Sequence, residues 1–181
     1  ELAEGNIDFR GDIVIHGNVE SGVNIRATGS ITIDGVAEAC MLEAGKDIIL
    51  RGGMLGGNKA SVKTKGAITA KFFEFTNILC EGDLQADVLM DCSVICHGQI
   101  RLTGRKGSII GGKVQAIRGL IATSLGNDAE KRTEIFVGAG IDVYSRLRVM
   151  EKKIETTREE LAKIEEGLEK FEILSKERGV S

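Results

Sequence analysis

Residues 25–50 read IRATGSITIDGVAEACMLEAGKDIIL, a series of short apolar runs separated by glycines. In Ile31-Thr32-Ile33 apolar and polar residues alternate, which is the pattern of a β-strand that buries one face. Glycine between such runs permits tight bends that a Cβ atom would obstruct. This part of the chain therefore predicts short strands joined by tight corners.

The same pattern recurs along the chain at intervals of 16 to 20 residues. When the repeats are aligned, apolar residues fall into two columns. The first contains Ile13, Ile31, Ile48, Ile68, Leu84, Ile100 and Leu120, and the second contains Ile7, Ile25, Leu42, Val62, Ile78, Val94 and Val114. A strand–turn–strand unit of this length fits one coil of a parallel β-helix, with each column as an interior ladder. A left-handed hexapeptide helix would need a six-residue period, which is missing. We therefore predict an all-β solenoid with a helical appendage: a right-handed parallel β-helix of about seven coils over residues 1–141.

Two of the repeats contain glycine-rich insertions. They read RGGMLGGNKAS at residues 51–61 and TGRKGSIIGGK at residues 103–113. Neither matches the GxxxxGK[ST] pattern of a phosphate-binding loop, and no helix pattern follows them. We expect both insertions to bulge from the coils as loops.

From Asp142 the pattern becomes helical, with apolar residues spaced as in heptads. The a positions hold Leu147, Ile154, Leu161 and Leu168, and the d positions hold Met150, Thr157, Ile164 and Phe171. We predict a long C-terminal coiled-coil helix over residues 142–181, with all of these except Thr157 as contact residues. A single apolar stripe on a charged helix needs a partner in water. That partner is either a second copy or another part of the chain.

Composition narrows the class of protein. The formal net charge is −3, which gives no general reason to expect nucleic acid as a partner. The sequence has no run of 18 apolar residues and no signal peptide pattern, so we expect no membrane span. Because it opens at Glu1 within a repeat, we expect it to be a fragment of a longer protein.

Taken together, these features resemble the flagellar assembly protein A family of bacteria. The resemblance rests on residues 23–72, on GSIIGGKVQAIRGLIATSLG at residues 107–126, and on the Glu/Lys-rich heptads; it covers about residues 5–175. It implies a cytoplasmic, non-catalytic protein that acts through protein contacts in the assembly or regulation of polar flagella, with the cell pole as an expected location. It supplies no active-site residues. Lys46 and Arg118 depart from the pattern, because other coils have glycine at that corner.

The four cysteines fall into columns of small residues. Cys80 and Cys96 align with Ala44, and Cys40 and Cys92 align with Ala60. We expect buried, inert thiols rather than a metal site, because a structural zinc site needs four convergent ligands.

Other polar residues do not suggest catalysis. His16 and His97 lie at corners, and no carboxylate shares a column with either in the alignment. The aspartates Asp12, Asp34, Asp47, Asp83 and Asp91 are scattered over different turn positions. An active site should gather such groups on one face. We therefore expect no enzyme, no metal and no cofactor.

Two segments, residues 48–73 and 92–127, contain basic residues and no acidic ones. Solubilising charge is the favoured interpretation. An anionic partner is the alternative, because phosphates bind such basic patches. Residues 92–127 contain no aromatic residue on which a base could stack.

A candidate partner-binding strip lies in the column that should point outward. This column contains Arg26, Glu43, Lys63, Leu79, Ile95, Gln115 and Phe136. Leu79 and Ile95 are apolar neighbours, and Phe73 and Phe75 are close in sequence. An exposed apolar strip of Leu79, Ile95, Phe136, Phe73 and Phe75 would serve a protein partner.

Two functions remain open from the sequence. The first is a protein-interaction scaffold, and the alternative is a polymer-forming cytoskeletal protein of the bactofilin type. An unpaired final coil would favour polymer growth. Here the last coil, EIFVGAGID at residues 134–142, runs into the predicted helix, which we expect to cap it. This favours the scaffold.

Overall fold

A computed structural model describes residues 5–104, 106–127, 131–138, 150, 152–158, 160–161 and 163–164. The chain divides into two units, Glu1–Gly138 and Ala139–Ser181. All of the described strands lie in the first unit, and all of the described helical residues lie in the second. Among the described residues, no helix combines the length and apolar character that crossing a membrane requires.

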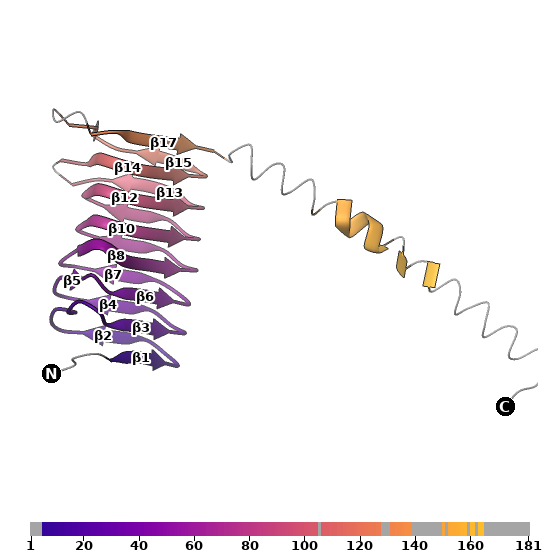
Figure 1. The fold of residues 1–181 in the computed structure, drawn as a ribbon, viewed down its shortest axis with the longest axis horizontal. Coiled ribbons are helices and arrows are strands. Elements are labelled where there is room, and N and C mark those ends of the chain that lie inside the picture. The colour runs from indigo at the N-terminus through magenta and orange to yellow at the C-terminus, as the bar shows by residue number, and fades with distance from the viewer. Residues whose placement is uncertain are drawn as a thin grey trace, which may run out of the picture. The chain divides into compact units, whose positions relative to one another are not determined.

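The first unit is a parallel β-solenoid whose coils stack in chain order (Figure 1). Its smaller sheet has the order β15-β13-β11-β9-β7-β4-β2, and its larger sheet has the order β1-β3-β6-β8-β10-β12-β14-β16, with β17 on β14 and β5 on β8. The strands are β1 (Asn6–Phe9), β2 (Ile13–Ile15), β3 (Asn24–Ala27), β4 (Ile31–Ile33), β5 (Ala37–Glu38), β6 (Met41–Ala44), β7 (Ile48–Leu50), β8 (Met54–Thr64), β9 (Ile68–Ala70), β10 (Phe72–Cys80), β11 (Leu84–Ala86), β12 (Val88–Cys96), β13 (Gln99–Leu102), β14 (Ser108–Ala116), β15 (Gly119–Ile121), β16 (Ser124–Leu125) and β17 (Thr133–Val137).

Strand register confirms the two apolar columns. Ile13 pairs with Ile31, and each later member of that column pairs with the next up to Leu120. The column from Ile7 to Val114 is paired in the same way. Most members of both columns are buried, so the ladders form the interior. The prediction of a parallel solenoid of about seven turns is confirmed, and its right-handed winding stays a prediction.

The long strands of the larger sheet change direction at a corner column. Asn58, Phe75 and Asp91 lie there with positive φ values of 60°, 45° and 49°. A residue in the left-handed backbone conformation bends the strand, while the strand stays hydrogen-bonded to the neighbouring coil. The larger sheet therefore supplies two faces. We call the smaller sheet the first face, the strand segments before this corner the second face, and the segments after it the third face.

The expectation that the glycine-rich insertions are loops is wrong for the larger part of each. Residues 54–64 and 108–116 are the continuous strands β8 and β14. Their glycines supply the corner conformation, with φ of 53° at Gly57 and 69° at Gly111. Because glycine adopts positive φ at little cost, the strand turns the corner while staying in the sheet.

Aspartates on alternate coils cap the next coil at the corner before the first face. The Oδ1 atoms of Asp12, Asp47 and Asp83 accept hydrogen bonds from the backbone N–H groups of Ser30, Ala67 and Gln99, at 2.7, 2.7 and 2.8 Å. The view that the aspartates are scattered is therefore wrong for these three. The bond from Gln99, together with the Arg118 guanidinium, lowers the pKa of Asp83.

These caps explain three of the corner glycines. A Cβ atom on Gly29, Gly66 or Gly98 would lie 2.1, 2.4 or 2.3 Å from the capping carboxylate oxygen of the coil before it. Lys46 and Arg118 follow coils whose corner residues are Ser30 and Gln99. No carboxylate of that column occupies the space there. Gly82 also follows a coil without one, and a Cβ atom at Gly82 would lie 2.5 Å from the Gly66 carbonyl oxygen, so the caps account for Gly29, Gly66 and Gly98 only.

All four cysteines are buried and free, as predicted. Burial raises the pKa of the Cys40 and Cys92 thiols to about 11. Cys80 pairs with Cys96 on the next coil, and its hydrogen bond with that thiol, together with burial, raises its pKa. A thiol needs its thiolate form to react, so Cys40, Cys80 and Cys92 are protected both by burial and by a raised pKa. At Cys96 the hydrogen bond with Cys80 lowers the pKa, so burial alone protects that thiol.

We therefore expect a thiol reagent at neutral pH to label almost none of the four cysteines in the folded protein. In denaturant all four should react. Mass spectrometry of the labelled protein would count the modified thiols. Rapid labelling of Cys80 and Cys96 without denaturant would contradict their interior placement.

The second unit supports only part of the predicted helix. Residues 152–158 are helical, as are Met150, residues 160–161 and residues 163–164. The predicted contact residues Leu147, Leu168 and Phe171 lie outside the described residues. A long helix and its coiled-coil pairing therefore stay predictions.

Candidate protein-interaction surface

The third face carries an outward column that continues through eight strands. We call it the outer ladder; register pairs its members in the order Asp8, Arg26, Glu43, Lys63, Leu79, Ile95, Gln115 and Phe136. The predicted outward column is thus confirmed. A parallel sheet spaces such side chains by about 4.8 Å, which fixes their relative positions without any loop.

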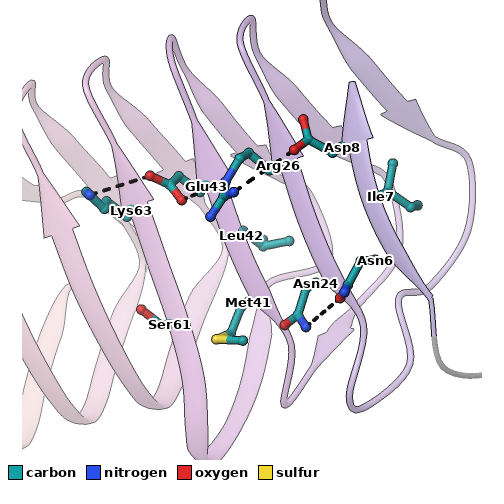
Figure 2. A pocket seen from close by; sticks show the side chains of 10 residues that line it. All are labelled: Asn6, Ile7, Asp8, Asn24, Arg26, Met41, Leu42, Glu43, Ser61 and Lys63. Carbon is teal, nitrogen blue, oxygen red and sulfur yellow. Dashed lines mark hydrogen bonds and ion pairs between the residues drawn. The ribbon is translucent and has the colours of Figure 1, made fainter. Parts of the chain in front are cut away.

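The first half of the outer ladder is a chain of ion pairs (Figure 2). The Arg26 guanidinium lies between Asp8 and Glu43, with Nη1 4.0 Å from Asp8 Oδ2 and Nε 3.0 Å from Glu43 Oε2. Lys63 Nζ lies 3.4 Å from Glu43 Oε1. The hydrogen bond from Arg26 lowers the pKa of Glu43. Because these pairs are exposed they add little stability, but they neutralise this half of the ladder.

A second outward column runs beside the outer ladder along its whole length. Asn24 Nδ2 donates to Asn6 Oδ1 at 2.8 Å, and Met41 and Ser61 follow on the next coils (Figure 2). Met41 is an exposed apolar residue that the sequence interpretation missed. The sequence interpretation considered only one outward column. Met41 immediately precedes Leu42 of the interior ladder, so alternation along the strand also predicts that it points outward.

The apolar half of the outer ladder begins at Leu79. Leu79 is half-buried and Ile95 is 44% exposed. Together with Ser61, Asn77, Ile78 and Ser93 they line a shallow depression. Phe136 is also exposed, but Gln115 separates it from Ile95. The Lys113 Nζ atom lies 5.2 Å from the centroid of the Phe136 ring, a distance at which a cation and a ring attract.

Phe73 does not belong to this surface, contrary to the prediction. It is fully buried on the second face, in register with Met54 and Leu89. Phe75 is half-buried at the corner column, with Lys131 Nζ 5.7 Å from its ring centroid. The candidate surface therefore reduces to Leu79, Ile95 and Phe136, with Phe75 at its border.

His16 has an acidic neighbour, contrary to the sequence interpretation. Its Nδ1 atom lies 2.8 Å from Asp34 Oδ2, and the other oxygen of that carboxylate lies 3.2 Å from Arg51 Nε. These three residues follow the strands of the first face on consecutive coils. The His16 side chain is 83% exposed, so water screens the pair. In the part of the chain that the structure describes, no group of three or more His, Cys, Asp or Glu side chains could hold a metal ion.

Three of the ten basic residues in residues 48–73 and 92–127 contact a carboxylate on another coil. Arg51 contacts Asp34, Lys63 contacts Glu43, and Arg118 contacts Asp83. Arg105 lies outside the described residues. Local neutralisation of this kind favours solubilising charge over a site for a polyanion.

The chain matches the family model described as the flagellar assembly protein A beta solenoid domain over residues 1–180. No curated protein and no solved structure gives a significant match.

Proposed function

The chain belongs to the flagellar assembly protein A beta solenoid domain family, and from this membership we propose that it is a non-catalytic protein-interaction scaffold in bacterial flagellar assembly or its regulation. We place its action in the cytoplasm, at the cell pole. The observation that carries the scaffold role is the outward apolar pair on the third face, half-buried Leu79 and exposed Ile95.

The third face suits a protein partner because it offers two kinds of contact in a fixed order. The charged half presents alternating signs from Asp8 to Lys63, and the apolar half follows directly. Covering the exposed part of Ile95 would contribute about 2 kcal/mol before association costs. The apolar pair would thus provide affinity, and the alternating charges would select the register of the partner.

The polar corners support a non-catalytic role. The carboxylates of Asp12, Asp47 and Asp83 accept backbone hydrogen bonds from the next coil, and Asp34 is held between His16 and Arg51. These groups act as structural caps and exposed ion pairs, on several coils. We infer that their role is to hold coils together.

A polymer of the bactofilin type remains the second candidate, because both end coils expose apolar side chains. At the N-terminal end these are Phe9 and Val14, and at the last coils they are Ile121, Leu125 and Val137. The strands β1 and β17 lie at edges of the larger sheet and could pair with strands of another copy. Filaments of the purified protein in electron micrographs would favour this function, and their absence at high concentration would favour the scaffold.

The scaffold role predicts that Leu79→Lys combined with Ile95→Lys leaves the solenoid folded but disrupts flagellar assembly. Both side chains point outward, so lysine can extend into solvent while its charge opposes an apolar contact. In cells whose only copy carries the double variant, we expect the fraction with flagella to fall by more than about tenfold, as a loss of about 2 kcal/mol or more in the contact implies. Electron microscopy would count flagella, and immunoblotting would check the protein level.

A matched control changes two outward residues of the first face. Thr69 and Gln85 are exposed and lie in register on neighbouring coils. Thr69→Lys combined with Gln85→Lys adds the same charge and should leave flagella unchanged. Normal flagella in the Leu79/Ile95 variant would exclude this strip as the contact, and loss of its β-sheet circular dichroism would show that the strip is core.

A further inference from the structure

The helical residues of the second unit expose a single apolar stripe. Met150, Ile154, Leu161 and Ile164 are 65%, 54%, 56% and 60% exposed. Met150, Ile154 and Leu161 also line a shallow depression with Lys153, Thr157 and Arg158. A stripe limited to a and d positions has the width of a two-stranded coiled-coil seam. The charges beside the stripe indicate which helix can cover it.

The flanking charges match a second copy in one orientation. In an antiparallel pair, g positions of one helix lie beside g positions of the other, and e positions lie beside e positions. If Ile154 faces Thr157 and Met150 faces Leu161, then Lys153 lies beside Glu160 of the other copy. By sequence, Glu151 then lies beside Arg158. Two-fold symmetry repeats both pairs, so four flanking pairs have opposite charges.

Other arrangements lack this complementarity. In a parallel, in-register pair each g residue lies beside the e residue five positions later on the other helix. By sequence, Lys153 would then be matched with Arg158, and Glu160 with Glu165, so two of the three flanking pairs repel, while Arg146 with Glu151 attracts. An antiparallel pair shifted by one heptad brings Glu160 beside Glu160 and Arg158 beside Arg158. Of these arrangements, only the first register has no repelling flanking pair.

We propose that this helix binds the same helix of a second copy as an antiparallel coiled coil in that register. The inference rests on the proposed scaffold function and deepens it. A dimer of this kind carries two third faces, so it is bivalent. A partner with two or more binding sites would then be held more tightly than by one face, without any new contact.

The test uses charge reversals, because parallel and antiparallel pairing give results of opposite sign. In the antiparallel dimer, Lys153→Glu places glutamate beside Glu160, and Glu160→Lys places lysine beside Lys153. At low ionic strength each change should raise the dimer dissociation constant about tenfold, since each dimer contains two such pairs. The double variant restores opposite charges and should bind within about twofold of the original chain. Analytical ultracentrifugation of the whole chain measures all four constants.

Two further variants check that the effect comes from the seam between the helices. Lys152→Glu, at an f position away from the seam, should leave the constant unchanged, whereas Leu161→Asp should abolish the dimer and keep the β-sheet circular dichroism. Single reversals that tighten the dimer would establish parallel pairing and overturn the proposal. A chain that stays monomeric at all concentrations would also overturn it, by excluding a second copy as the occupant. Neither result depends on flagella, so the scaffold function is tested separately.

Discussion

Replacing Phe73 with alanine should lower the free energy of unfolding of the solenoid by about 3–5 kcal/mol, the cost of removing a fully buried aromatic ring. The ring is 0% exposed and lies in register between Met54 and Leu89 of the adjacent coils. Both neighbours are themselves fully buried in strands, so the coils cannot close the space without breaking their ladder. Urea denaturation followed by circular dichroism would measure the difference.

The matched control for this change is Phe9→Ala. Phe9 belongs to the first strand of the solenoid and is 52% exposed. Its removal should cost less than about 1 kcal/mol, because much of its ring already contacts water. Equal effects of the two substitutions would mean that the second face does not pack Phe73 as the structure has it.

Replacing Gly66 with alanine should cost about 2–3 kcal/mol through overpacking between coils. The new Cβ atom would lie 2.4 Å from Asp47 Oδ1 and 2.7 Å from the Lys46 carbonyl carbon. Moving the carboxylate away would break its hydrogen bond with the Ala67 N–H. Moving the backbone would separate two coils. The same denaturation experiment measures the loss.

Three further variants separate the causes. Gly17→Ala is the control, because no atom lies within 4 Å of the added Cβ and the position does not require positive φ; it should change stability by less than about 0.5 kcal/mol. Asp47→Ala combined with Gly66→Ala removes the carboxylate but keeps the Lys46 backbone. Because Asp47→Ala also removes the hydrogen bond to the Ala67 N–H, the comparison is with Asp47→Ala alone. The double variant should be less stable than that single variant, and equal stability of the two would show that the backbone contact is unimportant.

The interior of the solenoid could be predicted because one rule governs it. Strand side chains alternate between two sides, and coils repeat, so Ile25 identifies both its partner Leu42 and the outward Arg26. The same rule failed at Phe73. Counting back by twos from the buried Cys80 through Ile78 and Thr76 makes position 74 inward and position 73 outward. The positive φ of Phe75 reverses this alternation, so Phe73 is buried instead.

The candidate surface was predictable in its placement but not in its contacts. The outward column follows from register alone. The ion pairs of Arg26 with Glu43 depend on side-chain rotamers, which no periodicity specifies. The pair of His16 with Asp34 did have a signal that was missed, because each residue directly follows a strand of the first face. Extending the alignment past the strands into the corners would have placed them together.

The capping aspartates set a rule for how such a chain can grow. Asp12, Asp47 and Asp83 are 35 and 36 residues apart, which is two coils. A gene duplication that copied two coils would again place glycine beside each capping carboxylate. A duplication of the single coil that begins at Lys46 would place the copied Lys46 where Gly66 now lies, beside Asp47, in a space with no room for a Cβ atom. Solenoids built on this corner should therefore gain a coil only where glycine follows each capping carboxylate.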